Sequence, residues 1–485
     1  MALRILATTD RDFGEQFARL RPRPANDPTI ERAAGRIVDA VRRRGDAALL
    51  EAIARYDRVR LSAAELEVPR AEVEAAVQQL PPAARRALSF AAQRIAAFHR
   101  HQRERSWQYR DALGFVLGQR LHPLDRVGVY VPGGHAAYPS SVLMNVIPAR
   151  VAGVKEVVMA TPAGPSGVAP AVLAAAAIAG VDRVYRMGGA QAVAALAYGT
   201  ATVPKVDKIV GPGNAWVQAA KRLVFGVVDI DGIAGPSEVV VIADEHAAPE
   251  CVAADLLAQA EHGSGDECAL LLTPCRALAL ATQAEVERQL RGLSRRQSIA
   301  RVLARRAAVV VVRDLNEAIA LAEDVAPEHL ELLVRNPRRW LPHIRHAGAV
   351  FVGPWAPAPV GDYAAGPNHV LPTGGTARFF SPLGVYDFVH RTSVVEASRD
   401  ALRRLAPVVT TLAALEGYDA HAAAVQVRFA QCPVHTNVGP TRPVAQGGAR
   451  MRRVLRTQPN RQRHDNGKKG SSHGQGEKTR HTRRR

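Results

Sequence analysis

The stretch VKEVVMATPAGPSGVAPAVLAAAAIAGVDRVYRM, residues 154–187, decides the fold of this chain. It begins and ends with a short run rich in apolar and β-branched residues, and an Ala-rich segment behind a proline lies between the two runs. Such runs recur from residue 126 to residue 353, as RVGVYV, VDKIV, SEVVVIAD, CALLLT, AAVVVVRD and GAVFVG. Apolar strands that alternate with helices are typical of βαβ units, whose parallel strands are covered on both faces.

Eight runs of this kind suit two parallel sheets better than one, with the seam near the turn GPSE at residues 235–238. We therefore predict an α/β protein with two Rossmann-like domains, flanked by helical segments whose apolar residues recur at helical spacing. The expected domain plan has an N-terminal helical region packing on the core (1–125), the two Rossmann-like domains (126–236 and 237–378), a C-terminal helical segment (379–431) and a disordered basic tail (432–485).

The composition indicates an ordinary globular protein, with 47% hydrophobic and 22% charged residues. No signal pattern opens the sequence, and the longest apolar stretch, GVAPAVLAAAAIAGV, is shorter than the roughly 18–20 residues of a membrane span. The four cysteines form no CxxC pair, which argues against a thiolate zinc cluster and suits a reducing compartment. We expect a cytoplasmic protein without a membrane partner.

The net charge of +19 is concentrated at one end, because residues 431–485 contain 14 Lys/Arg and only 2 Asp/Glu. This segment has no apolar periodicity and is expected to be disordered. It is either an arm for nucleic acid or another acidic partner, or a dispensable extension. The body contains no zinc-finger, RNP or helix–turn–helix pattern, so nucleic acid is not expected as a partner outside the tail.

Three glycine-rich turns follow predicted strands, in YVPGGHAAYPSS, MGGAQAVAAL and GPGNAWVQAAKRL. Each turn leads into a helix, whose first N–H groups could meet a phosphate. None matches GxGxxG, and each alone could be a structural turn. Together, at strand ends of one sheet, they favour a nucleotide-type ligand.

Polar residues that could bind a metal are dispersed along the chain. Gln259 and His262, in AQAEHG, share one helix face, although a histidine there could also interact with the helix dipole. Asp362 stands in a Gly/Pro-rich loop, and Glu416 and His421 flank GYDA in the C-terminal helical segment, where a solvated polar face is the alternative. Oxygen and imidazole ligands without thiolate suit Zn²⁺.

The segment VAPEHLELL offers an acid beside a base. Pro327 fits the first position of a helix, which would place Glu328 and His329 in its first turn. The positive helix end would favour ionised Glu328 and a neutral His329 that can accept a proton. The alternative is a capping glutamate beside a surface histidine.

Taken together, VGVYVPGG, GGAQAVAALAYGT, VDKIVGPGNAWV, AGPSEVVVIAD, AQAEHG, PEHLEL and GDYAAGPNHVLPT resemble the characteristic segments of the histidinol dehydrogenase family. The resemblance runs in order from about residue 5 to residue 430, and the tail has no counterpart in it. It implies a four-electron, NAD-dependent oxidation of L-histidinol to L-histidine through bound histidinaldehyde, the last step of histidine biosynthesis.

The resemblance also implies roles for individual residues. Glu328 would activate water and His329 would accept protons, and the family forms homodimers in which the C-terminal segment completes the partner's site. One Zn²⁺ per subunit would be bound by Gln259, His262, Asp362 and His421. NAD would be contacted by Tyr130, Gln191 and Asn214. The substrate would be contacted by Ser237, Gln259, His262, His329, Asp362, Glu416 and His421.

Three alternatives remain at this point. The chain could oxidise a different amino alcohol with the same zinc and base. It could use Cys251, Cys268 or Cys275 as a nucleophile that forms a thiohemiacetal. It could bind nucleic acid through its tail.

Overall fold

The computed structural model describes residues 3–21, 27–133, 137–262 and 265–430. The predicted disordered tail, residues 432–485, lies outside these described residues. The chain divides into two compact units, and the boundary along the sequence lies between residues 405 and 406, inside a helix.

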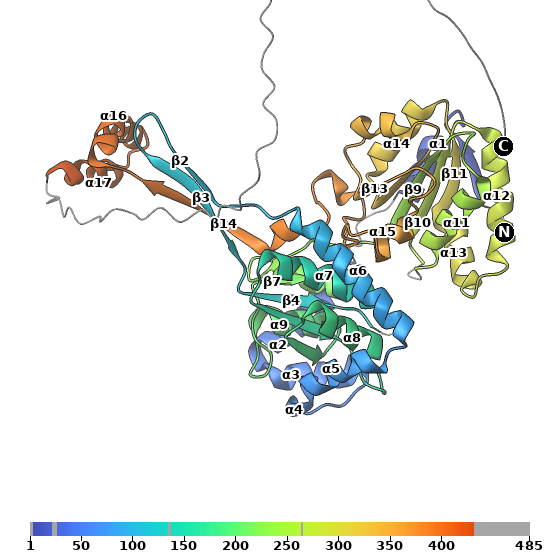
Figure 1. Cartoon of the computed structure of the whole chain (residues 1–485), viewed down its shortest axis with the longest axis horizontal. Helices are drawn as coiled ribbons and strands as arrows, with labels where there is room; N and C mark the ends of the chain where they lie inside the picture. The colour runs from blue at the N-terminus through green and yellow to red at the C-terminus, as the bar shows by residue number, and fades with distance from the viewer. Residues whose placement is uncertain (1–2, 22–26, 134–136, 263–264, 431–485) are drawn as a thin grey trace, which may run out of the picture. The chain divides into compact units, whose positions relative to one another are not determined.

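The first parallel sheet has five strands in the order β6-β5-β4-β7-β8. Two of them, β4 and β7, are labelled in Figure 1. Its strands are β4 (Arg126–Tyr130), β5 (Glu156–Thr161), β6 (Arg183–Arg186), β7 (Lys208–Val210) and β8 (Asp229–Ile230). Its helices are α2 (Pro28–Arg44), α3 (Asp46–Ala52), the π-helical turn η1 (Ile53–Asp57), α4 (Ala63–Leu66), α5 (Arg70–Gln79), α6 (Pro82–Arg100), α7 (Pro139–Ala152), α8 (Pro170–Ala179), α9 (Gly189–Tyr198) and α10 (Ala215–Val224).

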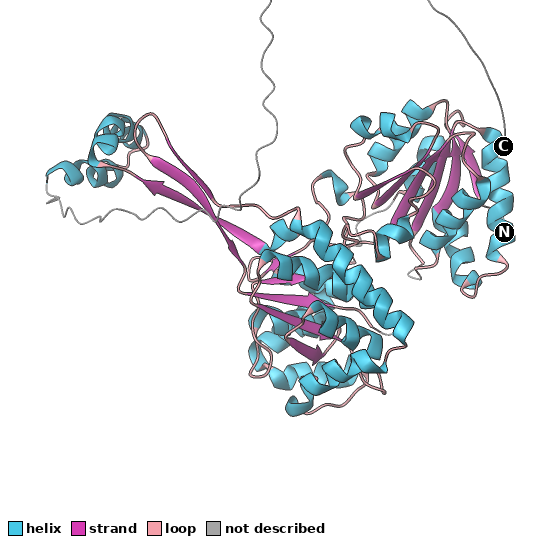
Figure 2. Ribbon diagram, in the orientation of Figure 1, coloured by secondary structure: helices cyan, strands magenta, loops and turns pink. Residues whose placement is uncertain are grey.

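Helices cover both faces of this sheet, as the alternation of side chains along β5 requires (Figure 2). Val157 and Met159 pack into a core with α7 and α8, whereas Val158 and Ala160 pack on the other face, against α9 and α10. The strand is therefore apolar at each of its four central positions, residues 157–160, which is the pattern that predicted a buried parallel sheet.

The second parallel sheet has six strands in the order β1-β11-β10-β9-β12-β13. Its strands are β1 (Arg4–Ala7), β9 (Glu238–Ala243), β10 (Cys268–Thr273), β11 (Ala307–Val311), β12 (His329–Leu333) and β13 (Ala349–Val352). Its helices are α1 (Phe13–Leu20), α11 (Pro249–Ala260), α12 (Arg276–Leu290), α13 (Arg296–Arg306), α14 (Leu315–Val325) and α15 (Ala358–Tyr363), with 3₁₀ turns η2 (Pro337–Arg339), η3 (Leu341–His343) and η4 (Thr376–Arg378). A further 3₁₀ turn, η5 (Val385–Phe388), packs on α7 of the first sheet, and Phe388 joins that core.

The prediction of an α/β protein with two parallel sheets is confirmed. The domain limits stay predictions, and two features depart from the plan. Residues 4–7 form an edge strand of the second sheet instead of belonging to a helical region. A third, antiparallel sheet of order β14-β3-β2 is formed by β2 (Trp107–Arg110), β3 (Val116–Pro123) and β14 (Val389–Glu396).

The antiparallel sheet was not predicted from the sequence because it lacks a buried face. All four residues of β2 are exposed, and most of β14 is exposed as well. Without burial on one side, no alternation of apolar and polar residues marks the strands.

The segment predicted to be helical, residues 379–431, contains β14 and then the helices α16 (Arg399–Leu415) and α17 (Asp419–Ala430). The second unit begins at Ala406, inside α16. Among the described helices, none combines the length and the apolar character needed to cross a membrane.

Candidate active site

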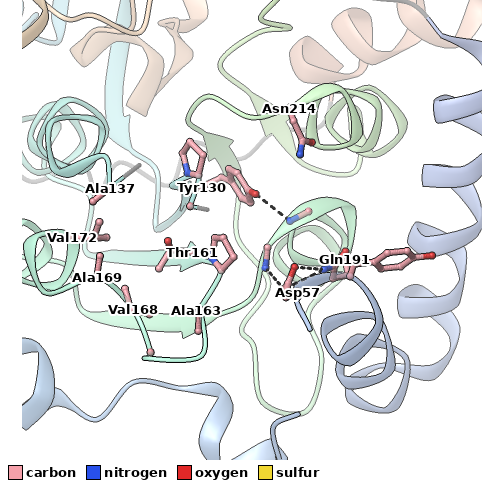
Figure 3. Close-up of a pocket in the computed structure, with 18 of the residues that line it drawn as sticks. Asp57, Tyr130, Ala137, Thr161, Ala163, Val168, Ala169, Val172, Gln191 and Asn214 are labelled. Atoms are coloured by element: carbon pink, nitrogen blue, oxygen red, sulfur yellow. Dashed lines mark hydrogen bonds between the residues drawn. The ribbon is translucent and has the colours of Figure 1, made fainter. Parts of the chain in front are cut away.

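A cavity of about 770 Å³ lies at the carboxyl ends of strands in the first sheet (Figure 3). Tyr130 is the last residue of β4, Gln191 lies in the first turn of α9 after β6, and Asn214 caps α10 after β7. All three line the cavity, so the structure brings together the three predicted NAD contacts. Residues 134–136 of the first glycine-rich turn lie outside the described part of the chain.

The side chains of this cavity hold one another in place. The phenol oxygen of Tyr130 accepts a hydrogen bond of 3.1 Å from the Gly189 amide, and burial raises the pKa of Tyr130 to about 12. The Gln191 amide nitrogen donates to both carboxylate oxygens of Asp57 at 3.4 Å. The Asn214 oxygen accepts from the amides of Trp216 and Val217, at 3.1 and 3.2 Å.

The glycine-rich turns differ from expectation in one respect. The sequence predicts N–H groups that could meet a phosphate, but groups of the protein itself accept hydrogen bonds from several of them. The Gly188 amide donates to Asp57 at 3.0 Å, and the Gly211 amide donates to Asp231 at 2.7 Å. Carboxylates of the chain therefore occupy positions where a ligand phosphate would bind in a GxGxxG turn.

The turn before α9 requires glycine at two positions. Gly189 has φ +61°, and a Cβ there would lie 2.8 Å from the side-chain oxygen of Gln191. A Cβ on Gly188 would lie 2.8 Å from Pro162 and 3.1 Å from Asp57. The two glycines thus allow the close approach of Gln191 and Asp57.

The second cluster of interest lies around Glu328 and His329, and here the predicted local structure is wrong. These residues do not begin a helix: α14 ends at Val325, its C-cap Ala326 lies in the left-handed region with φ 51°, and β12 starts at His329. The whole of β12 is buried between β9 and β13. Burial in the sheet outweighs the helical pattern of the segment, and Pro327 stands at the entrance of a strand, where its missing N–H is tolerated.

The Glu238 backbone connects the acid and the base. The Glu238 amide donates to the Glu328 carboxylate at 3.0 Å, and His329 Nδ1 lies 3.2 Å from the Glu238 carbonyl oxygen. Because a carbonyl only accepts, Nδ1 carries the proton of the neutral ring, and Nε2 is the atom left to act as a base. Nε2 lies 3.4 Å from Asp362 Oδ1.

The charge state of His329 also differs from expectation. Burial alone would lower the pKa of His329, but the Glu328 and Asp362 carboxylates outweigh it and raise that pKa to about 9. Burial raises the pKa of Glu328. The helix-end argument for a neutral imidazole therefore fails, because no helix begins at these residues.

Glu238 is a member of this cluster that the sequence analysis missed. Its side chain is fully buried and accepts from the Gly374 amide at 3.0 and 3.2 Å. Burial and the neighbouring Glu328 carboxylate raise the pKa of Glu238 to about 8. The sequence feature that could have identified Glu238 is its position, as a glutamate at the start of an apolar strand and directly after Ser237. Ser237, a predicted substrate contact, is half buried.

Three of the four predicted zinc ligands lie in this part of the molecule. Gln259 is in the last turn of α11 and is 4% exposed, and its side-chain nitrogen has no hydrogen-bond partner among the described residues. His262 follows the end of the same helix. Burial by itself would raise the pKa of Asp362. The hydrogen bond with His329 lowers this pKa, and the electrostatic effect of His262 adds to the lowering, so His262 lies near Asp362.

An unpartnered buried amide is costly unless a ligand satisfies it. The amide can present its oxygen in the same place, because nitrogen and oxygen are assigned by their surroundings. Gln259, His262 and Asp362 therefore fit a Zn²⁺ site that takes oxygen and imidazole ligands.

Another group of potential ligands, Asp244, Glu245 and His246, lies at the opposite end of β9. Both oxygens of Asp244 already accept backbone hydrogen bonds, from the amides of His246 and Arg335 at 3.0 and 2.8 Å. Glu245 and His246 are not buried. This arrangement is that of a turn stabilised by an aspartate.

The last two predicted site residues, Glu416 and His421, belong to the second unit. Both are exposed there, and the His421 ring stacks on Tyr418 with ring centroids 5.1 Å apart. None of the described contacts of the first unit's cluster includes them.

Comparison with known proteins shows extensive similarity. A family model described as histidinol dehydrogenase matches residues 21–429. The chain is 56% identical over 409 residues to the histidinol dehydrogenase of Bordetella parapertussis, covering 84% of this chain and 92% of that relative. It is 53% identical over 438 residues to that of Ralstonia nicotianae, covering 88% and 98%.

A solved structure of histidinol dehydrogenase from Elizabethkingia anophelis superposes with a TM-score of 0.83 at 33% identity, covering 88% of this chain and 98% of that one. These matches confirm the resemblance inferred from the sequence segments. They do not favour the alternative of a dehydrogenase for another amino alcohol.

Proposed function

The chain belongs to the histidinol dehydrogenase family of NAD-dependent oxidoreductases, and on this premise we propose how its residues carry out the reaction. L-Histidinol is oxidised to L-histidine in two successive steps, with bound histidinaldehyde between them. The observation that supports this proposal is the buried pair Glu328 and His329, joined through the Glu238 backbone and placed beside Asp362.

His329 Nε2 accepts the proton of the alcohol in the first step. The Glu238 carbonyl fixes the ring through Nδ1, so that Nε2 faces the site with little freedom to turn. L-Histidinol is cationic at neutral pH, and positive charge beside Glu328 and Asp362 favours release of the proton from His329. Each step delivers a hydride to NAD⁺, which is the chemistry that this cofactor supplies.

Glu328 activates water for attack on the aldehyde. Its carboxylate is held by the Glu238 amide, and its burial makes it a stronger base than an exposed glutamate. His329 then takes a further proton as the hydrated aldehyde is oxidised. His329 thus serves both steps of the reaction, and Glu328 serves the second.

Gln259, His262 and Asp362 would hold Zn²⁺, together with His421. The ion would supply a template that binds the amino and imidazole nitrogens of the substrate, and its value lies in positioning. Ser237, Glu416 and the ligand residues would contact the same substrate. Tyr130, Gln191 and Asn214 would contact NAD in the cavity of the first sheet.

We propose that the protein acts as a homodimer in which His421 and Glu416 of one chain complete the site of the other. Two features support this. Apolar side chains of the second unit are exposed, among them Leu412 at 54% and Leu415 at 79%. On the antiparallel sheet, Trp107 and Val395 are exposed at 54% and 68%. Exposed apolar side chains of this size often mark protein interfaces.

A cytoplasmic location stays a prediction.

The stoichiometry of the reaction tests the proposal. Purified, zinc-loaded protein should form about two NADH per L-histidinol, and removal of the metal with a chelator should abolish turnover until Zn²⁺ is returned. Calorimetric titration of the metal-free protein with NAD⁺ is the control. NAD⁺ should still bind, because none of the proposed zinc ligands lines the cavity of the first sheet. One NADH with free aldehyde, or turnover that survives complete metal removal, would contradict the proposal.

Replacing the cysteines by alanine tests the thiohemiacetal alternative. Cys268 is buried in β10, which leaves Cys251 and Cys275 as the more accessible thiols among the described residues. Retained turnover is expected.

A further inference from the structure

We infer that Asp57 makes the cavity of the first sheet select an unphosphorylated dinucleotide and reject one that carries a 2′-phosphate. The inference rests on the proposed binding of NAD in this cavity. It adds a specificity-determining residue that lies outside every glycine-rich turn.

Asp57 is the only charged residue among the described residues that line the cavity. No lysine, arginine or histidine stands among those described lining residues. Sites that accept a 2′-phosphate usually provide an arginine for it, because the group brings nearly two negative charges. Among these described lining residues, a 2′-phosphate would find one carboxylate and no cation.

The position of Asp57 strengthens this argument (Figure 3). It ends the π-helical turn η1, and the next residue, Arg58, has φ 60° in the left-handed region, which turns the chain away after the carboxylate. The Asp57 carboxylate then accepts from the Gly188 amide at 3.0 Å and from the Gln191 side chain at 3.4 Å. It lies at the N-terminal end of α9, where the helix dipole would otherwise favour an anionic group of the ligand.

A carboxylate in this place suits a hydroxyl better than a phosphate. Two carboxylate oxygens have about four acceptor positions, and the contacts with Gly188 and Gln191 leave at least one for a ribose hydroxyl. A phosphate can only repel it, and repulsion between charges is strong at short range in a partly buried cavity.

Binding measurements on the full chain test the inference. Isothermal titration calorimetry would compare NAD⁺ with NADP⁺, and 5′-AMP with adenosine 2′,5′-bisphosphate. The wild-type protein should bind the member of each pair without the 2′-phosphate at least about tenfold more tightly. In the variant Asp57→Asn this preference should shrink about tenfold, because the isosteric amide removes the charge and keeps one acceptor.

Two further variants separate charge from structure. Asp57→Glu keeps the negative charge but places it differently. This variant should therefore bind both NAD⁺ and NADP⁺ more weakly and still prefer NAD⁺. Asp46→Asn is the matched control: Asp46 lies on the neighbouring helix α3, accepts from the Thr202 hydroxyl at 2.7 Å and does not line the cavity. Its preference should equal that of the wild type.

The outcomes are distinct. If Asp57→Asn weakens both cofactors equally and leaves the preference unchanged, Asp57 only anchors the Gly188 turn and the inference is overturned. If the wild-type protein binds 5′-AMP and adenosine 2′,5′-bisphosphate equally, the inference fails without any variant. If the wild-type protein binds neither NAD⁺ nor NADP⁺, the proposed cofactor cavity itself is wrong.

Discussion

The two parallel sheets use opposite edges. In the first sheet the cavity lies at the carboxyl ends of the strands, after Tyr130 of β4 and before α9 and α10. In the second sheet the acid–base cluster lies at the amino ends, where β12 starts at His329 and β9 starts at Glu238. The first sheet follows the general rule for ligand sites in open α/β sheets, and the second does not.

The difference follows from what each edge has to supply. Cofactor binding needs glycine-rich turns and helix N-termini, which follow the carboxyl ends of strands. The amino edge of the second sheet receives the C-terminal end of α11, with Gln259 and His262, because a helix that connects parallel strands runs back across the sheet. The proposed zinc ligands Gln259 and His262 therefore lie at the same edge of the sheet as His329.

If the two edges have separate tasks, changing His329 should affect chemistry alone. His329→Asn keeps a donor toward the Glu238 carbonyl and removes the basic Nε2. We expect turnover to fall about 10³-fold, in the range of a lost general base, with an unchanged Kd for NAD⁺. Steady-state kinetics and calorimetry measure the two quantities. A large loss of NAD⁺ affinity would show that the edges are not separate.

Glu328→Gln should divide the reaction at its middle. The amide still accepts from the Glu238 amide, so the local fold is kept, but the base that activates water is lost. Oxidation of histidinaldehyde should slow about 10²-fold, with a smaller effect on the first hydride transfer. Stopped-flow absorbance would resolve the two phases of NADH formation. Equal slowing of both phases would remove the assigned role of Glu328.

At the opposite edge, Gln191→Met should weaken cofactor binding. The substitution preserves the volume of a buried side chain and removes its hydrogen bonds to Asp57. We expect KM for NAD⁺ to rise about tenfold while KM for histidinol stays the same. A rise in KM for histidinol alone would contradict the assignment of Gln191 as an NAD contact.

The smallest effect is expected from the tail. Deletion of residues 432–485 removes most of the net positive charge but none of the proposed site residues. Turnover and both KM values should stay within about twofold of the full chain, and binding to nucleic acid, if measurable, should disappear. A loss of turnover would show that the tail contributes to the enzyme.

The sequence was sufficient for the central strands of both parallel sheets, because runs such as residues 157–160 and 239–243 are buried on two faces and therefore apolar. It failed for VAPEHLELL, since an apolar segment with a leading proline fits a helix start and a strand entrance equally well. Only the position between β9 and β13 decides the question, and that position depends on residues far away in the chain.

The candidate site was predicted in part for a similar reason. Tyr130, Gln191 and Asn214 stand in glycine-rich turns that can be recognised locally. Asp57 and Glu238 stand in segments without a local pattern, and their importance arises from contacts: Asp57 meets Gly188, which is 131 residues later. No spacing rule within a single sequence reveals such a pair.

The edge strand β1 has a consequence for how the protein is made. Arg4 pairs with Ala308, so the second sheet is closed by a segment synthesised about 300 residues before its partner, and the first domain is inserted between the two. During translation residues 28–230, which form most of the first domain, can begin to fold as soon as they leave the ribosome, although Leu383 and Phe388 join its core later. We expect nascent chains stalled near residue 260 to protect residues 28–230 from protease while residues 4–7 remain open to cleavage. The dehydrogenase would then acquire its cofactor cavity before its catalytic edge exists.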